Sequence, residues 1–327
     1  MLYDENISLT GRIVSPGEAQ YDSARQAFNT FFNRFPFVIV FAQNTQDVVN
    51  AVRWSLHKNV PIRVRSGGHN YEGLSVLDGG QGILSRPLGL LLDHVVEIEI
   101  VDTNGCVLQV NDQEHPDLFW ALRDRGGSFG ICTPFRFRTQ EIKTVGFAEI
   151  SWGHQDLKAV IQEWQKYTLP TSNKYFTPTL LLSLEETSPL LIHGIFHGSV
   201  TDLQKLIQIF LQIGSPIKID IKELSYLEAI TLISNHQPAT PFPFKSVAPF
   251  IDTLLPEEGI VTIQHFISQA PPNTTVSIFF QGLDGTVSEV SEEAVQGIRW
   301  VEDFRHALIL FTKGVYVNTP DLLMKDW

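Results

Sequence analysis

Apolar residues in the first 140 positions form one short continuous run and one run at helical spacing. Residues 37–41 (FVIVF) are apolar and rich in β-branched side chains, which predicts a buried strand. Apolar residues in 48–56 then recur at helical spacing, with Thr45 as the expected N-cap. Pro61 ends this helix, and residues 62–64 predict a second strand. The order favours a parallel strand pair joined by a helical crossover.

The remainder of this region predicts antiparallel strands. Residues 95–101 and 106–110 alternate between apolar and polar side chains, and Asn104-Gly105 between them is typical of a hairpin turn. A short helix is expected over 116–123, and a further strand over 131–138.

From about residue 145 the pattern changes to strands that alternate with amphipathic helices. Strands are predicted at 147–152, 179–184, 190–197 and 275–281. Helices are predicted at 156–167, 202–213, 222–235 and 257–270. This order predicts an α+β domain with an antiparallel sheet, beginning near residues 140–147.

Composition narrows the function. The 327 residues suffice for two domains, and 43% hydrophobic with 18% charged residues is typical of a folded globular protein. A net charge of −12 argues against nucleic-acid and anionic-membrane partners. No signal peptide or membrane-spanning run is evident, so a cytoplasmic location is the default expectation. The two cysteines, Cys106 and Cys132, lie in predicted strands and are expected to be buried free thiols, with no metal site.

The strongest local feature is the loop of residues 64–73 (VRSGGHNYEG). Adjacent Gly67 and Gly68 permit positive φ and let backbone N–H groups converge on an anion such as a diphosphate. His69 follows directly, and its imidazole nitrogen is a competent nucleophile. The alternative is an ordinary tight turn with a hydrogen-bonded histidine.

Two further glycine clusters occupy residues 79–82 and 126–130. Each alone indicates a loop, but three clusters in one domain would allow several loops to approach one large cofactor. His193 and His197 lie in a predicted strand, where surface positions are favoured over a metal pair. Residues 126–130 (GGSFG) match Gly-x-Ser-x-Gly, but they lie between a predicted helix and a predicted strand. The elbow of a hydrolase joins a strand to a helix, so a hydrolase has no support.

Residues 61–75 resemble the flavin-attachment loop of the berberine-bridge-enzyme-like FAD-linked oxidases. These oxidases have the vanillyl-alcohol oxidase/p-cresol methylhydroxylase (PCMH) fold. The resemblance continues in the same order through later blocks, which are residues 80–86, Gly89, Leu90, Asp93, and residues 117–123, 126–131 and 316–321.

This resemblance implies an α+β protein with an FAD-binding PCMH-type domain over residues 1–143 and a substrate-binding domain over 144–320. Residues 321–327 would begin a return to the FAD domain. FAD would be held covalently through His69, and a hydride would pass to it from an alcohol, sugar or secondary-metabolite substrate, with molecular oxygen as acceptor. The implied FAD-binding residues are Arg65, Ser66, Gly67, Gly68, His69, Asn70, Gly73, Gly82, Gly89, Gly127, Gly130 and Ile131.

The chain departs from the family pattern at three places. Between Ser75 and Gly79 a segment that includes a second flavin-linking cysteine is absent, so His69 would be the single covalent anchor. A segment near residues 293–298, close to the reacting base, is also absent, and no catalytic base is assigned. The chain stops at Trp327, soon after the last matching block. The alternative function is therefore a truncated, non-catalytic remnant with weak or no FAD binding.

Overall fold

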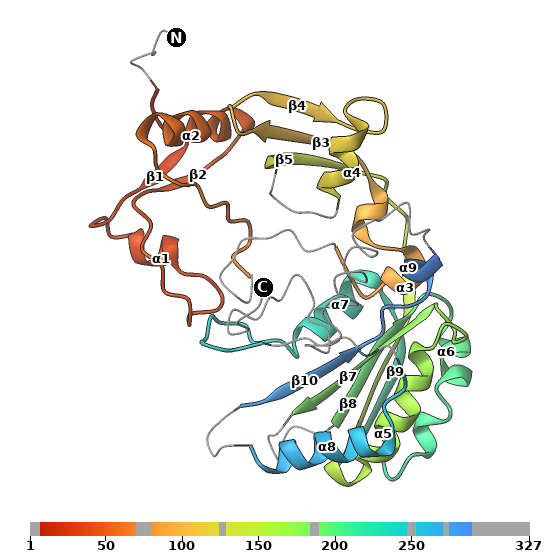
Figure 1. The fold of residues 1–327 in the computed structure, drawn as a ribbon. Helices are drawn as coiled ribbons and strands as arrows, with labels where there is room; N and C mark the ends of the chain where they lie inside the picture. Colours follow the sequence, from red (N-terminus) through yellow and green to blue (C-terminus); the bar gives the residue numbers. More distant parts are fainter. Residues whose placement is uncertain are drawn as a thin grey trace.

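The computed structural model describes residues 7–69, 80–123, 129–183, 190–246, 251, 253–270 and 275–289. The described chain forms a first half up to residue 138 with two small sheets, and a second half from residue 144 with one larger sheet (Figure 1). The absent segments expected near residues 75–79 and 293–298, and the block at 316–321, lie outside the described residues.

The first half begins with a two-stranded antiparallel sheet. Strands β1 (Arg12–Val14) and β2 (Ile39–Phe41) pair with Arg12 opposite Phe41, and α1 (Tyr21–Arg25) lies between them in sequence. Helix α2 (Thr45–Lys58) follows β2. Its N-cap is Asn44, one residue before the predicted Thr45, because the Asn44 side chain accepts a hydrogen bond of 3.0 Å from the Asp47 N–H.

The predicted parallel strand pair is wrong. β2 pairs with β1, a segment that precedes it in the chain, and residues 62–64 form no strand. Ile62 and Val64 are each 43% exposed, so their β-branched side chains lack the packed surface that favours strand formation.

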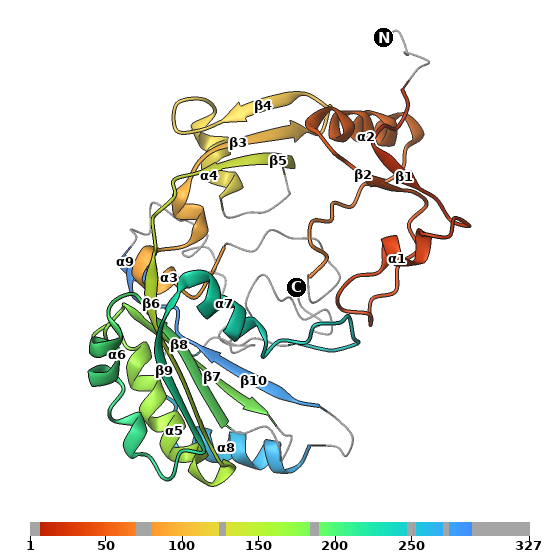
Figure 2. The ribbon, with the colours of Figure 1, turned by 180° about the vertical axis from the view of Figure 1, so that it is seen from behind.

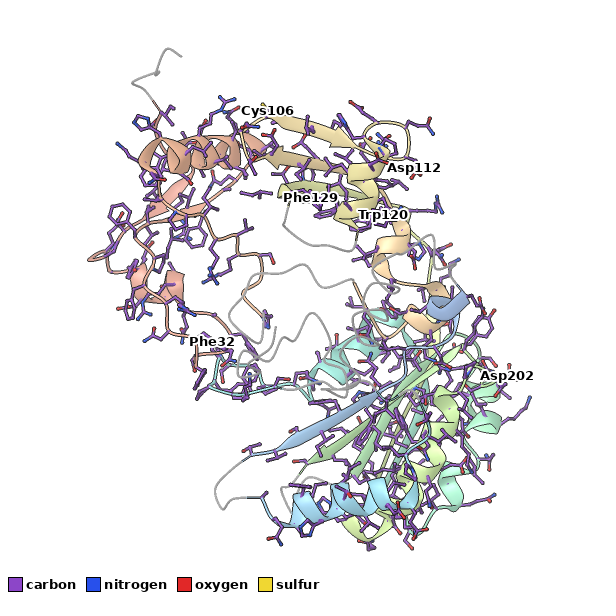
Figure 3. All side chains as sticks on the ribbon, in the orientation of Figure 1. Phe32, Cys106, Asp112, Trp120, Phe129 and Asp202 are labelled. Carbon is purple, nitrogen blue, oxygen red and sulfur yellow. The ribbon has the colours of Figure 1, made fainter. Side chains whose placement is uncertain are left out.

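The second small sheet confirms the predicted hairpin. Strand β3 (Val95–Asp102) pairs antiparallel with β4 (Val107–Val110) and with β5 (Gly130–Phe137). Helix α4 (Pro116–Leu122) covers it, with a core made by Val95, Ile98, Ile100, Val110, Phe119 and Leu122. Cys132 lies partly buried in β5, but Cys106 is exposed at the β3–β4 turn (Figure 3), so its predicted burial is wrong.

The second half contains the predicted antiparallel sheet, with five strands in the order β10-β7-β8-β6-β9. The strands are β6 (Thr144–Trp152), β7 (Phe176–Ser183), β8 (Leu190–Phe196), β9 (Lys218–Ser225) and β10 (Ser277–Gln281). Together with the helices this makes the α+β fold that the sequence predicted.

Three helices cover one face of this sheet, as both views show (Figures 1 and 2). They are α5 (Leu157–Trp164), α6 (Val200–Leu206) and α8 (Glu257–Ser268). The apolar core beneath them includes Trp152, Leu180, Ile192 and Phe210, all fully buried or nearly so. Burial of such side chains contributes about 1.5–3 kcal/mol each, so this layer supplies much of the stability of the second half.

Helix α7 (Tyr226–Ser234) lies over the opposite face, on the side toward the first half (Figure 2). The predicted helix over 222–235 starts too early, because residues 222–225 belong to β9. Ser225 and Glu228 form a capping box that fixes the true helix start. The predicted helix over 202–213 is also divided, into α6 and a 3₁₀ turn at Phe210–Gln212.

A buried arginine joins the two halves. Arg86, on the short helix α3 (Ser85–Leu88), is 1% exposed and its Nε lies 2.6 Å from Oδ1 of Asp284. Its guanidinium also donates to Ser172 Oγ at 2.7 Å and to the Phe176 carbonyl. Asp284 precedes α9 (Thr286–Glu289), so this contact fixes α3 against the edge of the second half. The division into domains at residues 143–144 stays a prediction.

Candidate functional site

The described part of the first glycine loop, Arg65 to His69, is a compact turn with exposed side chains. Gly68 has a φ of +75°, and the Phe28 N–H donates to its carbonyl at 3.0 Å. The His69 ring stacks on Phe28 with 4.5 Å between ring centroids and 24° between planes. The loop therefore presents the imidazole to solvent while one ring face is held.

Phe28 is itself held by a segment from the second half. The ring of Phe242 contacts it edge-on at 5.7 Å, and the Phe242 N–H donates to the Phe28 carbonyl at 3.1 Å. Asn29 Nδ2 donates to the Phe244 carbonyl at 2.9 Å. Figure 1 shows this stretch, which follows α7, reaching across to the chain beyond α1. His69 consequently lies where the two halves of the molecule meet.

The other predicted flavin-binding residues are distributed over separate loops. A Cβ added at Gly82 would meet no atom within 4 Å, so its backbone is open to a ligand. Gly89 has a φ of +88° and a Cβ there would lie 2.7 Å from Asp93 Oδ2, which gives it a structural reason to be glycine. Gly130 is similarly crowded by the Val101 carbonyl, and Ile131 pairs with Val101 in the sheet. Asn70, Gly73 and Gly127 lie outside the described residues.

These residues suit FAD. The Gly67-Gly68 backbone can approach a diphosphate closely, and the exposed Ile62, Val64 and Phe129 offer apolar surface for a ring system. His69 is the last described residue of the loop, and its ring is exposed.

A second cluster of titratable groups lies on the sheet of the second half. Glu149 on β6 accepts hydrogen bonds from Lys218 Nζ at 2.5 Å and pairs with His236 Nε2 at 2.7 Å. The His236 ring stacks on His193 of β8, with centroids 5.3 Å apart and planes within 12°. The cluster joins three strands of the sheet, β6, β8 and β9, to His236, which lies just beyond the C-terminal end of α7.

Burial controls the ionisation of this cluster. Burial lowers the pKa of His193 to about 4, and the charge of His236 acts in the same direction. Burial opposes ionisation of Glu149, but the hydrogen bonds from Lys218 and His236 outweigh it and lower the pKa of this carboxyl. At neutral pH the cluster thus holds an ionised Glu149 and a neutral His193.

The predicted surface position of His193 is wrong, since its side chain is only 2% exposed. Strand β8 lies third of five in the sheet, so β8 has a neighbouring strand on each side and helices cover one face. Sequence reasoning also missed Glu149 and His236. Glu149 alternates with apolar residues in β6, and this pattern could have indicated that its side chain lies on the sheet face opposite to theirs. Its partners Lys218 and His236 come from distant segments, which the pattern does not identify.

Among the described residues, no group of three or more histidine, cysteine, aspartate or glutamate side chains could hold a metal ion. The helices in this described part include none that is long and apolar enough to span a bilayer.

The site and fold define a class: an FAD-binding protein of PCMH-type architecture. Residues 36–83 match the family described as FAD binding domain. This stretch includes the His69 loop. A solved berberine-bridge-enzyme-like protein of Physcomitrella patens is 19% identical, with a TM-score of 0.72, over 95% of this chain and 89% of the other. FAD is therefore the cofactor that this architecture binds.

Two individual relatives are similar to this chain over most of its length. The FAD-linked oxidoreductase YgaK of Bacillus subtilis is 29% identical over 412 positions, covering 99% of this chain and 91% of the relative. A structure of glucooligosaccharide oxidase from Acremonium strictum, described with cysteinyl- and histidyl-linked FAD, is 20% identical with a TM-score of 0.70, covering 87% and 76%. The predicted resemblance to berberine-bridge-enzyme-like FAD-linked oxidases is thus confirmed.

YgaK and this chain also differ in length over the aligned region. It runs over 412 positions, 85 more than the 327 residues of this chain. The relative therefore carries residues that have no counterpart here.

Proposed function

We propose that this protein is an FAD-dependent oxidoreductase that oxidises an alcohol group of a small molecule, with molecular oxygen as the acceptor. The observation that carries the proposal is His69, held against Phe28 at the meeting point of the two halves and within the stretch that matches an FAD-binding domain. The substrate class we favour is a sugar, since an oligosaccharide oxidase is among the similar structures.

Arg65 to Asn70, together with Gly73, Gly82, Gly89, Gly127, Gly130 and Ile131, would hold the cofactor. His69 would be its single covalent anchor. When bound, FAD supplies a hydride acceptor for a carbon of the substrate. The protein contributes the orientation of that carbon, which can lower a barrier by several kcal/mol.

The second half would supply the substrate side of the site, through the sheet face that bears Glu149 and His193. Neither residue is suited to be the catalytic base. Glu149 is already engaged by hydrogen bonds from the Lys218 ammonium and with the His236 ring, and the lowered pKa of His193 makes its ring a weak proton acceptor at neutral pH. No base is assigned among the described residues.

The alternative, a non-catalytic remnant, predicts an incomplete core. In the described residues the second half has a five-stranded sheet with one face closed by α5, α6 and α8. The comparisons give this alternative no better support than the oxidoreductase. We therefore retain the oxidoreductase.

The cofactor part of the proposal is tested by acid precipitation of the purified protein. Wild type is expected to give a yellow pellet, because a covalent bond survives denaturation. His69→Ala is expected to give a colourless pellet, and His265→Ala on α8, an exposed histidine far along the chain, should retain the colour. A colourless wild-type pellet with flavin in the supernatant would show that His69 is no covalent anchor. Absence of flavin from both fractions would overturn the proposal for this chain.

A further inference from the structure

The segment that follows α7 in the second half of the chain is bound to the segment that follows α1 in the first half. The Phe242 N–H donates to the Phe28 carbonyl at 3.1 Å, and the Thr30 N–H donates to the Phe242 carbonyl at 3.1 Å. Asn29 and Phe242 form an isolated parallel bridge. These bonds fix the backbone of residues 28–30 to a distant part of the chain.

Asn29 reinforces this contact from a buried position. It is 1% exposed, and its Nδ2 donates to the Phe244 carbonyl at 2.9 Å. Its Oδ1 accepts hydrogen bonds from the Phe244 N–H at 3.2 Å and from the Phe31 N–H at 3.1 Å. An amide that is buried and bonded at both ends holds one orientation, so the two segments keep one relative position.

Aromatic rings carry this contact to the histidine of the glycine turn. Phe242 and Phe244 stack on each other with ring centroids 4.8 Å apart, and both meet the Phe28 ring edge-on, at 5.7 and 6.1 Å. Phe28 in turn stacks on the His69 ring, with centroids 4.5 Å apart and 24° between planes. The Phe28 N–H also donates to the Gly68 carbonyl at 3.0 Å. Backbone and ring of Phe28 therefore both contact the turn that carries His69.

The stacked ring restricts a side chain that solvent would otherwise leave mobile. The His69 side chain is exposed, and an exposed ring in water samples several rotamers, few of which orient it for reaction with a cofactor. Stacking on Phe28 restricts the plane of the ring and covers one face. The nitrogen atoms of an imidazole lie at the ring edge, so stacking on a face leaves them uncovered.

We propose that the Phe242–Phe244 segment, acting through Phe28, positions the His69 ring for covalent attachment of FAD. The second half of the chain then controls a bond that is made in the first half. Phe28 and Phe242 are positioning residues, because an aromatic hydrocarbon ring takes no part in the bond itself. This inference rests on the proposed function, in which His69 is the covalent anchor.

Attachment joins a ring nitrogen of His69 to a carbon atom of the flavin. The unprotonated nitrogen gains a bond to a methyl carbon on the flavin ring system, that carbon loses one hydrogen, and the imidazole loses its N–H proton. The flavin takes up both protons and the electron pair of the broken C–H bond and is thereby reduced. Molecular oxygen, the acceptor in the proposed function, then receives them to form hydrogen peroxide. The rate of bond formation depends on how the nitrogen is oriented toward the carbon, which is the quantity that Phe28 restricts.

The test measures the rate of covalent attachment in full-length protein that is produced under riboflavin limitation and then incubated aerobically with FAD. Samples are precipitated with acid at intervals, and the flavin in each pellet is measured by absorbance. Phe28→Leu removes the stacking ring and is expected to slow attachment by about 3- to 10-fold. Phe242→Leu removes one edge contact of Phe28 and should slow it by about 2- to 3-fold. Phe28→Tyr keeps the ring and should attach FAD at the wild-type rate.

The dependence of the rate on FAD concentration separates positioning from a loss of structure. Positioning predicts that Phe28→Leu lowers the limiting rate of attachment and leaves the half-saturating FAD concentration unchanged. A damaged binding site would instead raise the half-saturating concentration. The matched control is Phe266→Leu on α8, which makes the same change at a phenylalanine that is 71% exposed and should behave as wild type does.

A wild-type limiting rate in Phe28→Leu would overturn the positioning role, as would equal slowing by Phe28→Leu and Phe28→Tyr. Thermal unfolding shows whether Phe28→Leu folds, and in its absence Phe242→Leu decides alone. Wild-type protein that binds FAD without attaching it would overturn this inference and the anchor role of His69 but not the oxidoreductase. Wild-type protein that binds no FAD would overturn the oxidoreductase and this inference together.

Discussion

Two histidines define the two regions of this molecule, and their surroundings differ in almost every respect. His69 is exposed at the end of a glycine turn, with one ring face against Phe28. His193 is buried in the middle of a sheet, stacked on a second histidine that is bound to a carboxylate. An exposed ring is accessible for reaction with a large cofactor, whereas a buried neutral ring is suited to precise hydrogen bonding.

The difference shows how environment assigns separate roles to the same side chain. Burial penalises the charged form, so His193 remains neutral where a solvent-exposed histidine would titrate freely. The two regions are joined by the Arg86–Asp284 pair and by the contact of the Phe242–Phe244 stretch with Phe28 and Asn29.

Arg86→Met should cause the largest loss of stability, because it leaves Asp284 buried without its cation. Burial already raises the pKa of Asp284, and the Arg86 pair offsets only part of that cost. We expect the free energy of unfolding to fall by about 3–5 kcal/mol in urea titrations. The double variant Arg86→Met/Asp284→Asn should recover part of the loss. Stability of the single variant equal to wild type would show that the two halves are not held together by this pair.

Acidification should destabilise the second half through His193. The folded-state pKa of about 4 lies below the usual histidine pKa of 6.5, so the stability contribution is complete above pH 6.5 and is lost as the pH falls toward 4. The total loss over this interval is about 3 kcal/mol. Chemical unfolding at a series of pH values should show this slope for wild type and for His69→Gln, and a smaller slope for His193→Gln. Identical curves for all three would contradict the buried, neutral state of His193.

Glu149→Gln should have a somewhat smaller effect at neutral pH, about 2 kcal/mol, because a charge-assisted hydrogen-bond pair is replaced by neutral bonds. The pKa of Glu149 is lowered on folding, so its stability contribution is present above the usual glutamate pKa of 4.5 and is lost as the pH falls below it. Unfolding midpoints of the variant should therefore converge with those of wild type in acid. A constant difference at every pH would exclude ionisation of Glu149 as the cause.

The smallest effect is expected for Lys158→Ala, which removes a pair with Glu257 between α5 and α8. Both side chains are largely exposed, so solvent screens the interaction. A double-mutant cycle with Glu257→Ala should give a coupling below about 1 kcal/mol. A coupling as large as that of the Arg86–Asp284 pair would remove the distinction between buried and surface pairs.

Local features of this chain were predictable from its sequence. The β3–β4 hairpin, helix α4 and the His69 loop each depend on residues close together in the chain, such as the Asn104-Gly105 turn. The family resemblance added the FAD cofactor, which no local rule identified. The overall α+β class followed from the order of elements in the second half.

Features built from distant residues were not predictable. β2 pairs with β1, and nothing in the sequence of residues 37–41 identifies β1 as the partner strand. Arg86 and Asp284 are 198 positions apart, and the Glu149–His236 contact joins residues 87 apart. The placement of Thr179, His193 and Glu149 side by side on one face of the sheet depends on strand register, which only the assembled sheet defines.

The most direct test of the central claim is an anaerobic titration of the purified, flavin-containing protein with cellobiose, followed in visible absorbance. We predict that cellobiose bleaches the flavin absorbance and that admitted air restores it. A protein that contains flavin whose absorbance no sugar or alcohol changes, or a protein that contains no flavin, would contradict it.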